Sequence, residues 1–490
     1  MQSKNNTALL IVLMLVQLLS AIDITIVTLA VPTIANDLHG LSLISLVFSA
    51  YMLASTISTP IYGKLSDLYG RKRLLQVGLA IFMVGSITCG ISPTMEVLVA
   101  ARALQGLGAG SMYTLAMTIV GDVFPLEKQA RAVGILSTVW SIAGIAGPFV
   151  GGLLIDTLGW HWIFFINVPF AIITIAALQL ILKEKVVPER HVLDIRGAVI
   201  LTLAIVVFLV AFIMIDGTDI TRDVVLAIAA FIVTFILLVI FYKMEKRAQE
   251  PFVPFYVFNK SVTIINLLAF LCSMVLMSLN VYLPIYLQNV QGFSATVSGL
   301  IVLSQSVSWC LVALTCGKAM MRYGPKPLLL ASNIILLISC AMMLVFNVDT
   351  LIIVDVAIIF VSGIAFGGSF TTVTVAVQNA SSDKNRGSVM GVMSLMRNLG
   401  STVGIGVFGA IFNICLVGYF QASGAGTIDP NNIYQLASMN PLVSQAQVID
   451  SIMQAVHTQL IALVVLGAIV VVLTAIMPKV SFRKPDAAKG

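Results

Sequence analysis

Stretches of about 20 mostly apolar residues recur along nearly the whole chain, separated by short connectors that carry charge, glycine or proline. Hydrophobic residues make up 59% of the 490 residues, and charged residues only 10%. Water-soluble domains could not bury that much apolar surface, so the surrounding solvent must be lipid. The sequence therefore predicts an all-α integral membrane protein.

Fourteen segments are long and apolar enough to be spanning helices. They cover residues 8–30, 41–60, 74–92, 95–118, 132–154, 162–182, 197–215, 224–242, 262–287, 297–315, 327–346, 351–376, 388–413 and 456–477. The first has no small-residue cleavage site, so we expect it to be retained. No segment is long enough for a separate soluble catalytic domain.

The basic residues lie almost entirely in alternate connectors between these segments. With the amino end inside, the outer connectors contain Arg222 as their only basic residue. The positive-inside rule then places both termini in the cytoplasm, which requires an even number of helices. The stretch 421–450 is expected outside, and its part from Ser438 to Ala455 is predicted to form a short amphipathic helix on the outer face.

The chain also contains a parallel repeat. A shift of about 254 to 257 residues aligns Gly63 with Gly317, Gly70 with Gly324, Lys72 with Lys326 and Gly144 with Gly400. Helices 1 to 6 then match helices 9 to 14. This predicts a bundle of six helices at 1–182, two inserted helices at 183–261, a second bundle of six at 262–477 with a long outer loop at 414–455, and a cytoplasmic tail at 478–490.

The connector after the second helix reads Gly63-Lys-Leu-Ser-Asp67-Leu-Tyr-Gly70-Arg71-Lys72-Arg73. It resembles the helix 2 to 3 signature of the major facilitator superfamily. The resemblance implies a conformational latch in which Gly63 lets helices approach, Asp67 pairs with a basic group or caps a helix, and Gly70 permits a tight turn. The alternative is that the cations only set topology.

Helix 4 carries Arg102-Ala-Leu-Gln105-Gly106, and helix 1 carries Asp23 as its only acid. The helix 1 sequence Ala21-Ile-Asp-Ile-Thr-Ile-Val27 resembles a motif of the fourteen-helix drug antiporters. At about 1.5 Å per residue, Asp23 and Arg102 both lie roughly 10 Å from the outer ends of their helices, so they can meet. Burial opposes the carboxylate charge and the guanidinium favours it, which suits proton coupling. A permanent ion pair between the two helices is the alternative.

Helix 5 contains Gly144, Gly147, Pro148, Gly151 and Gly152. This pattern resembles the antiporter motif that marks exporters within the superfamily. Glycines at this spacing allow a facing helix to come close, and the proline bends the segment, so a hinge or seal between the halves is expected. Ordinary packing of small residues is the alternative. The direction of transport rests on the resemblance.

Two further charges lie within predicted helices. Arg397 is about 13 Å into helix 13 without an obvious carboxylate at its depth, and it either holds carbonyl groups or lines the cavity of the second half. Asp355, just inside the outer end of helix 12, is either an interface acid or a coupling residue. Candidates for the substrate cavity combine aromatic, thioether and neutral polar side chains. They are Gln17, Tyr51, Met52, Gln105, Tyr113, Trp140, Asn280, Gln305, Trp309, Phe366 and Arg397.

The sequence thus predicts a proton-coupled antiporter of the major facilitator type that exports lipophilic drugs by alternating access. A lipid, siderophore or metabolite exporter is the first alternative, and a membrane enzyme or receptor is the second. The expected partners are neutral to monocationic drugs, protons and the lipid bilayer, without nucleic acid, and the expected state is a monomer. No cofactor or metal is expected, because the six cysteines are scattered and no phosphate-binding loop occurs. The resemblance implies a bacterial cell membrane.

Overall fold

The computed structural model describes residues 2–3, 6–124, 126–184, 195–213, 220–247, 255, 258, 260–380, 386–423, 433 and 443–478. Its long helices follow one another along the chain with short connections. In the amino-terminal half they are α1 (Asn6–Asp37), α2 (Ile44–Tyr69), α3 (Arg71–Gly90), α4 (Met95–Val123), α5 (Leu126–Leu158), the short α6 (Trp162–Phe165) and α7 (Asn167–Ile181).

The remaining helices follow the same pattern. They are α8 (Ile195–Ile213), α9 (Ile220–Glu245), α10 (Lys260–Ile285), α11 (Ala295–Tyr323), α12 (Pro325–Met342), α13 (Ile352–Ala380), α14 (Arg386–Ala422) and α16 (Gln445–Ile476). A π-helical turn, Tyr286–Val290, extends α10, and 3-10 turns occur at Leu41–Leu43 and Met343–Val345. The only strands in the described part are β1 (Gln2–Ser3) and β2 (Leu182–Lys183), which pair antiparallel.

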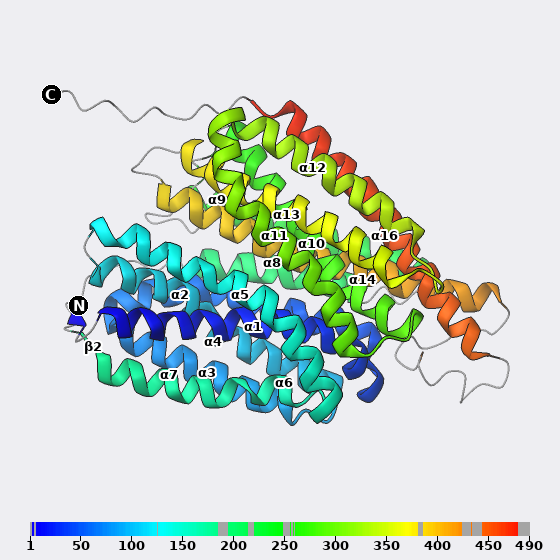
Figure 1. Ribbon diagram of the computed structural model, residues 1–490, viewed down its shortest axis with the longest axis horizontal. Helices are drawn as coiled ribbons and strands as arrows, with labels where there is room; N and C mark the ends of the chain where they lie inside the picture. Colours follow the sequence, from blue (N-terminus) through cyan, green and yellow to red (C-terminus); the bar gives the residue numbers. More distant parts are fainter. Residues whose placement is uncertain are drawn as a thin grey trace.

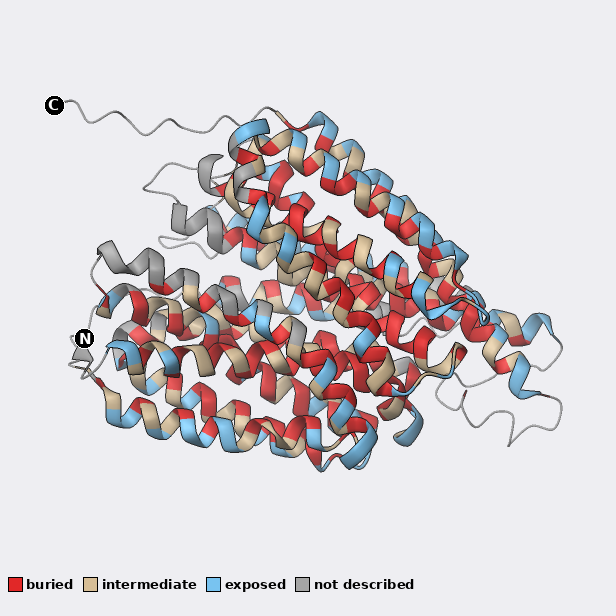
Figure 2. Ribbon diagram, in the orientation of Figure 1, coloured by how far each residue is buried: buried red, intermediate tan, exposed pale blue. Residues whose placement is uncertain are grey.

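Within the described residues, eleven helices are long and apolar enough to cross a membrane. Shorter apolar stretches occur at Ile142–Leu158 in α5 and Val199–Phe208 in α8. Apolar side chains are exposed along these helices, for example Phe235 at 68% and Leu314 at 76%. Exposed residues surround the buried interior in Figure 2, and many of them are large apolar side chains, as a lipid environment requires.

The helices gather into two bundles that meet at one end. α1 to α7 form one, and α10 to α16 form the other; the two diverge toward the end that carries both described termini (Figure 1). The pattern of contacts repeats between them. α5 packs on α1 and, across the boundary, on α11, while α14 packs on α10 and, across the boundary, on α2. This is the arrangement that a parallel repeat of helices predicts.

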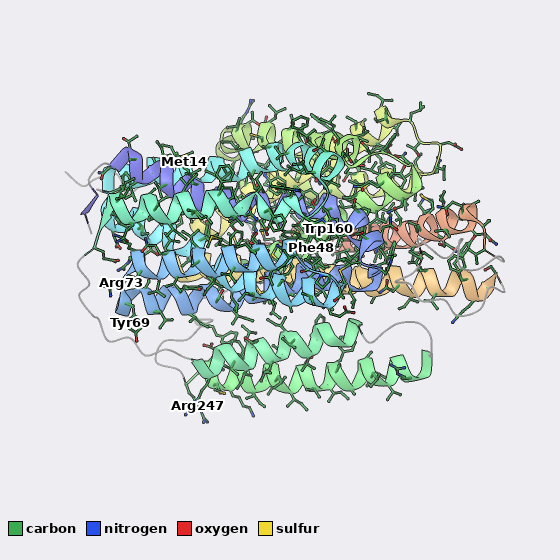
Figure 3. All side chains as sticks on the ribbon, turned by 90° about the horizontal axis from the view of Figure 1, so that it is seen from below. Met14, Phe48, Tyr69, Arg73, Trp160 and Arg247 are labelled. Carbon is green, nitrogen blue, oxygen red and sulfur yellow. The ribbon has the colours of Figure 1, made fainter. Side chains whose placement is uncertain are left out.

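α8 and α9 form a separate helical pair beside the bundles, as Figure 3 shows. α8 contacts α2 of one bundle and α14 of the other, through a small cluster that includes Leu201, Ile205 and Val392. Arg247, which follows α9, lies toward the same end as Arg73 (Figure 3). The linkers at 185–194, 214–219 and 248–254 lie outside the described residues.

Two expectations about the carboxyl-terminal part need correction. The predicted outer loop at 414–455 is shorter at both ends, because α14 continues to Ala422 and α16 begins at Gln445. The prediction of a separate amphipathic helix at Ser438–Ala455 is wrong from Gln445 onward, because those residues are continuous with the last apolar helix. Ser444 caps that helix, and Gln447 completes a capping box. Residues 424–432 and 434–442, and the tail from 479, lie outside the described part.

Candidate functional site

Asp23 and Arg102 are in direct contact inside the amino-terminal bundle. Nη1 of Arg102 lies 2.6 Å from Oδ2 of Asp23, and both side chains are almost fully buried. The guanidinium also lies over the ring of Tyr51, with Cζ 4.1 Å from the ring centroid. An ion pair this deeply buried is tolerated only where further polar groups satisfy its remaining hydrogen-bonding capacity.

Those polar groups come from α3, α4 and α7. Gln105 Nε2 donates to Asp23 Oδ1 at 2.8 Å, and Asn167 Nδ2 donates to the same oxygen at 3.2 Å. Both amides also donate to Ser86 Oγ, whose hydroxyl donates to the carbonyl of Phe164. Donors therefore meet both carboxylate oxygens, and the geometry matches an ionised Asp23.

Local sequence explains why these groups converge. A Cβ added at Gly106 would lie 2.3 Å from the carbonyl oxygen of Tyr51, and one added at Gly85 would lie 2.5 Å from the backbone nitrogen of Gln105. The absence of side chains at Gly85 and Gly106 lets α4 lie against both α2 and α3. Asn167 enters the network because α6 ends at Phe165 and α7 starts at Asn167, beside the pair.

The glycines of α5 divide between two faces. A Cβ at Gly147 would lie 2.1 Å from Thr25 Oγ1, and one at Gly151 would lie 3.0 Å from Ile26, so this face rests on α1 next to Asp23. The other face rests on α11 of the second bundle. There a Cβ at Gly152 would lie 2.6 Å from the carbonyl oxygen of Ala295.

Gly144 and Pro148 lie on that second face as well. A Cβ at Gly144 would lie 3.3 Å from Ser306 Oγ, whereas a Cβ at Gly299 of α11 would lie 2.3 Å from the carbonyl oxygen of Pro148. Helix α5 therefore touches both the segment of α1 carrying Asp23 and the opposite bundle.

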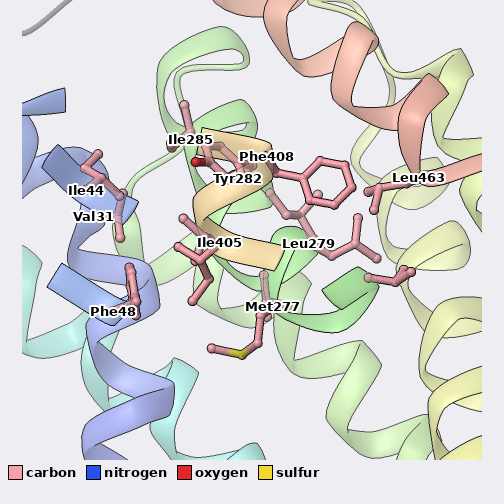
Figure 4. Packing of buried hydrophobic residues seen from close by; sticks show 14 of the residues in the cluster. Val31, Ile44, Phe48, Met277, Leu279, Tyr282, Ile285, Ile405, Phe408 and Leu463 are labelled. Carbon is pink, nitrogen blue, oxygen red and sulfur yellow. The ribbon is translucent and has the colours of Figure 1, made fainter. Parts of the chain in front are cut away.

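Hydrogen bonds cross the boundary between the bundles near the carboxyl-terminal end of α5, after the glycine motif. Asp156 accepts hydrogen bonds from the backbone N–H groups of Ala295 and Thr296 at 3.2 and 2.9 Å, at the start of α11. Gln288 Nε2 donates to the carbonyl of Leu29 in α1 at 3.0 Å. Apolar side chains fill the neighbouring boundary, where Phe48 lies near Ile405 (Figure 4). Sequence reasoning missed Asp156 and assigned no role to Gln288, although each is a polar residue at a helix end.

The motif between α2 and α3 is arranged within the amino-terminal bundle. Gly70 has φ of 95°, a conformation that favours glycine, and it joins the two helices. Arg71 Nε lies 2.7 Å from Asp122 Oδ2, and Glu184 accepts hydrogen bonds from the backbone N–H groups of Arg71 and Lys72. The side chain of Asp67 lies outside the described part of the structure.

Two details of that motif differ from expectation. Gly63 does not mark a close helix approach in this conformation, because an added Cβ would meet nothing nearer than Thr114 at 4.0 Å. Asp122 and Glu184, which sequence reasoning missed, bind the start of α3. A carboxylate at a helix amino terminus is the signal that could have found Glu184.

Several predicted cavity residues are instead buried among helices. Tyr51 and Gln105 belong to the Asp23 network, Gln305 donates to Ser362 Oγ at 3.2 Å, and Phe366 is fully buried. Gln17 is also buried, and its amide has no hydrogen-bond partner among the described residues. Met52 and Asn280 are half-buried. In this conformation none of Gln17, Tyr51, Gln105, Gln305 and Phe366 lies on an open surface, because helix packing covers them.

Other candidates remain accessible. Tyr113 of α4 and Trp140 of α5 are 48% and 40% exposed. Trp309 and Arg397 are half-buried in the second bundle. The guanidinium of Arg397 lies over Phe370, with Cζ 4.5 Å from the ring centroid. Arg397 was predicted either to hold carbonyl groups or to line the cavity of the second half. In the described part of the chain it donates no hydrogen bond to a carbonyl group.

Asp355 is buried at the start of α13. It accepts hydrogen bonds from Tyr286 at 3.3 Å and from Gln291 at 2.9 Å, next to the π-helical turn. The same turn carries Gln288, which contacts α1. Asp355 therefore supports the part of the second bundle that touches the first, and its two predicted roles, interface acid and coupling residue, stay predictions.

The comparisons with known proteins agree with this architecture. Residues 13–405 match the family described as the Major Facilitator Superfamily, and the chain belongs to it. Multidrug resistance protein 3 of Bacillus subtilis (strain 168) is 30% identical over 472 residues, covering 94% of this chain and 92% of the relative. Multidrug efflux pump SdrM of Staphylococcus aureus (strain N315) is 31% identical over 427 residues, covering 86% and 91%.

Solved structures share the fold. A bacterial homologue of the human lysosomal transporter Spinster, in an inward-facing and occupied conformation, aligns with a TM-score of 0.69 at 15% identity and covers 98% of both chains. A D-xylose-proton symporter aligns with a TM-score of 0.65 at 13% identity, covering 98% of this chain and 99% of its own. The chain is a multi-pass membrane transporter and not an enzyme.

Proposed function

We propose that this transporter is a proton-coupled antiporter that exports lipophilic drugs by alternating access. The observation that carries the proposal is the buried Asp23 carboxylate, held by Arg102, Gln105 and Asn167 beside α5, a helix that also packs on the opposite bundle. An intramembrane acid of this kind is expensive to maintain and typical of proton carriers. Relatives named as a multidrug resistance protein and an efflux pump support drugs as substrates.

The wider arrangement proposed with this function has fourteen spanning helices in two bundles of six, with α8 and α9 as the insert. Both termini lie in the cytoplasm of a bacterial cell, and the transporter works as a monomer in the cell membrane. The proton gradient is the only energy source, without a cofactor. Arg73 and Arg247, which lie toward the same end of the molecule in Figure 3, support this orientation if that end faces the cytoplasm.

In that orientation the structure corresponds to the inward-facing state. The outer ends of the bundles are joined through Asp156 and Gln288, while the inner ends diverge (Figure 1). Charged Asp23 fits this state, since it has just released a proton toward the cytoplasm. Drug then enters from the cytoplasm or the inner leaflet.

The α5 helix supplies a physical route between the proton site and the boundary. Protonation of Asp23 removes its attraction to Arg102, which frees the segment of α1 at Thr25 to shift. That segment rests on Gly147, and the opposite face of the same helix rests on α11. A shift of α1 is therefore transmitted to the contact between bundles, because packed helices move as units.

The proposed cycle has three steps. Drug binds between the bundles while Asp23 is charged, and the bundles rock to open outward. A proton from outside then neutralises Asp23 and weakens drug binding, so the drug leaves. The return to the inward-facing state carries the proton to the cytoplasm.

The direct test is release of protons when a drug binds to the purified transporter. In weakly buffered solution, a neutral lipophilic dye should release protons from wild-type protein, because drug binds the charged form of Asp23 more tightly. Asp23→Asn should release none. Asp37→Asn, which changes an exposed carboxylate hydrogen-bonded to Trp160, is the matched control and should behave as wild type. Equal proton release from Asp23→Asn and wild type would exclude the proposed coupling site.

A further inference from the structure

Arg397 lies within an apolar helix, and no carboxylate in the described part of the chain balances its charge. It lies in the apolar stretch Val392–Ala422 of α14. In the part of the chain that the structure describes, no carboxylate lies within ion-pair distance of it, and its guanidinium donates no hydrogen bond to a protein group. A guanidinium has five N–H donors, so most of its binding capacity is unused.

One face of the guanidinium is covered by aromatic rings. Arg397 lies over Phe370, and Trp309 stacks on Phe370 with ring centroids 5.2 Å apart and an angle of 8° between planes. The ring of Phe366 completes the group, with its centroid 6.0 Å from that of Trp309 and 6.2 Å from that of Phe370. We call Phe366, Phe370 and Trp309 the aromatic cluster. Cation–π contact stabilises the charge but leaves the N–H edge of the guanidinium open.

Two glycines of α13 build this cluster. A Cβ at Gly367 would lie 2.7 Å from the carbonyl oxygen of Trp309, and one at Gly363 would lie 2.1 Å from the carbonyl oxygen of Gln305. Without side chains at these positions α13 lies directly against α11, which brings Phe366 and Phe370 beside Trp309. The aromatic cluster is thus fixed by helix packing before any ligand arrives, which lowers the entropic cost of binding.

Arg397 and Trp309 are half-buried, so a part of each side chain remains accessible in the structure. A ligand that reaches them would meet an aromatic surface and a cation that makes no ion pair in the described part of the chain.

We propose that Arg397 and the aromatic cluster bind the carboxylate and the planar ring of the transported compound, so that aromatic carboxylates and zwitterions are among the exported substrates. A carboxylate matches the paired N–H donors of a guanidinium, and a planar ring matches the stacked surface beside them. This inference rests on the proposed export function for its transport consequence, but not for binding.

The charge of such a substrate would also improve the driving force. Entry of one proton is driven by the pH gradient and by the membrane potential, and the contribution of the potential grows with the number of charges that move. When a monoanion leaves in exchange, two positive charges move inward in net terms, so the voltage contribution doubles. Export of the acid should therefore carry twice the charge per molecule that export of a neutral analogue carries.

The test uses equilibrium binding of two fluorescent probes, an anthracene carboxylic acid and its primary amide, to the purified full-length transporter in lipid nanodiscs without a gradient. Arg397→Gln should weaken binding of the acid by about tenfold to a hundredfold, because a charge-assisted pair is lost, and change amide binding less than about threefold. Trp309→Leu should weaken binding of both probes to the same extent, because both carry the ring that stacks on Trp309. Equal weakening of both probes by Arg397→Gln, or unchanged binding of the acid, would overturn the assignment.

Two more variants keep the test decisive. Arg322→Gln is the matched control, because Arg322 also lies over an aromatic ring, Tyr323 at 5.2 Å, but is exposed at the end of α11. It should leave both affinities unchanged. Arg397→Lys keeps the cation and serves if the glutamine variant does not fold; it should weaken the acid by about threefold to tenfold and spare the amide. If these binding results hold while drug-induced proton release is absent in wild type, the proton coupling fails and the carboxylate site stands.

Discussion

Arg102 in the first bundle and Arg397 in the second both lie well inside their helices, and the two have opposite surroundings. Arg102 is fully buried and meets Asp23, Gln105 and Tyr51, so its charge is balanced by the protein. Arg397 is half-buried and meets only aromatic carbon, so its charge is balanced by nothing in the described part of the chain. The repeat duplicates helices and their packing but not charge. We infer that the first arginine serves an internal switch and the second serves a ligand.

The largest difference is expected in stability. Arg102→Gln leaves Asp23 buried without its counter-ion, and breaking such a pair typically costs about 3–5 kcal/mol. Arg397→Gln orphans no carboxylate, so its effect should stay below about 1 kcal/mol. Thermal unfolding in detergent at neutral pH measures both. The double variant Asp23→Asn with Arg102→Gln should regain much of the loss, and a similar loss in both single arginine variants would contradict the comparison.

Substrate charge tests the comparison through energetics. At a gradient of one pH unit and 100 mV, exchange of one proton for a neutral drug provides about 3.7 kcal/mol, enough for a concentration ratio of several hundred. A monocation leaves only about tenfold, and a dication moves net charge against the potential. Efflux from proteoliposomes should therefore rank neutral and zwitterionic drugs above monocations and monocations above dications. Strong export of a dication would be incompatible with one-proton exchange.

The bridging role of α5 predicts unequal effects from two identical substitutions. Gly152→Ala places a Cβ 2.6 Å from the backbone of α11, whereas Gly144→Ala places it 3.3 Å from a serine hydroxyl that can rotate away. Overpacking typically costs about 1–3 kcal/mol, so Gly152→Ala should open the outer boundary and slow drug export by about tenfold. Gly144→Ala is the matched control with a smaller effect. The reaction rate of a cysteine placed at the outer boundary with a thiol reagent measures the opening. Equal reaction rates and equal export rates in the two variants would contradict the proposal that α5 seals the boundary.

The smallest effect is expected at the motif between α2 and α3. Asp67→Asn should slow transport by only a few fold and leave drug binding intact, because a latch biases conformations without touching the drug. Asp122→Asn, which removes the partner of Arg71, should slow transport in a similar way. The rate of exchange between conformations and the equilibrium affinity for the drug are measured separately for each variant. Lost drug binding with unaltered exchange between conformations would refute a latch.

The sequence was most informative where helix geometry alone decides the outcome. The rise per residue predicted that Asp23 and Arg102 could meet, and the structure has them in contact. The hydropathy pattern predicted a membrane protein of helices, and the major facilitator family is confirmed. The glycine at position 70 indicated a tight turn, and its positive φ agrees.

The rest depends on which helix faces meet, which no local pattern specifies. Asn167 and Ser86 complete the Asp23 network only because α7 and α3 converge on it. Phe370 was not a candidate. It contacts Arg397 because Gly367 lets α13 pack closely on α11, which the sequence does not specify. The start of α16 at Gln445 was missed because polar residues there resemble a separate surface helix. For the Asp23 network, the signal that could have identified Asn167 is a polar amide within an apolar run.

The central claim is that Asp23 alone converts the proton gradient into drug movement, and one measurement separates this from every other role of the residue. Purified wild type and Asp23→Asn are reconstituted into liposomes, and transport of a neutral dye is followed with a pH gradient and then as exchange of labelled for unlabelled dye without one. We predict that Asp23→Asn abolishes gradient-driven accumulation while it keeps exchange and binds the dye within about tenfold of wild type. Gradient-driven accumulation at the wild-type level in Asp23→Asn would contradict the account.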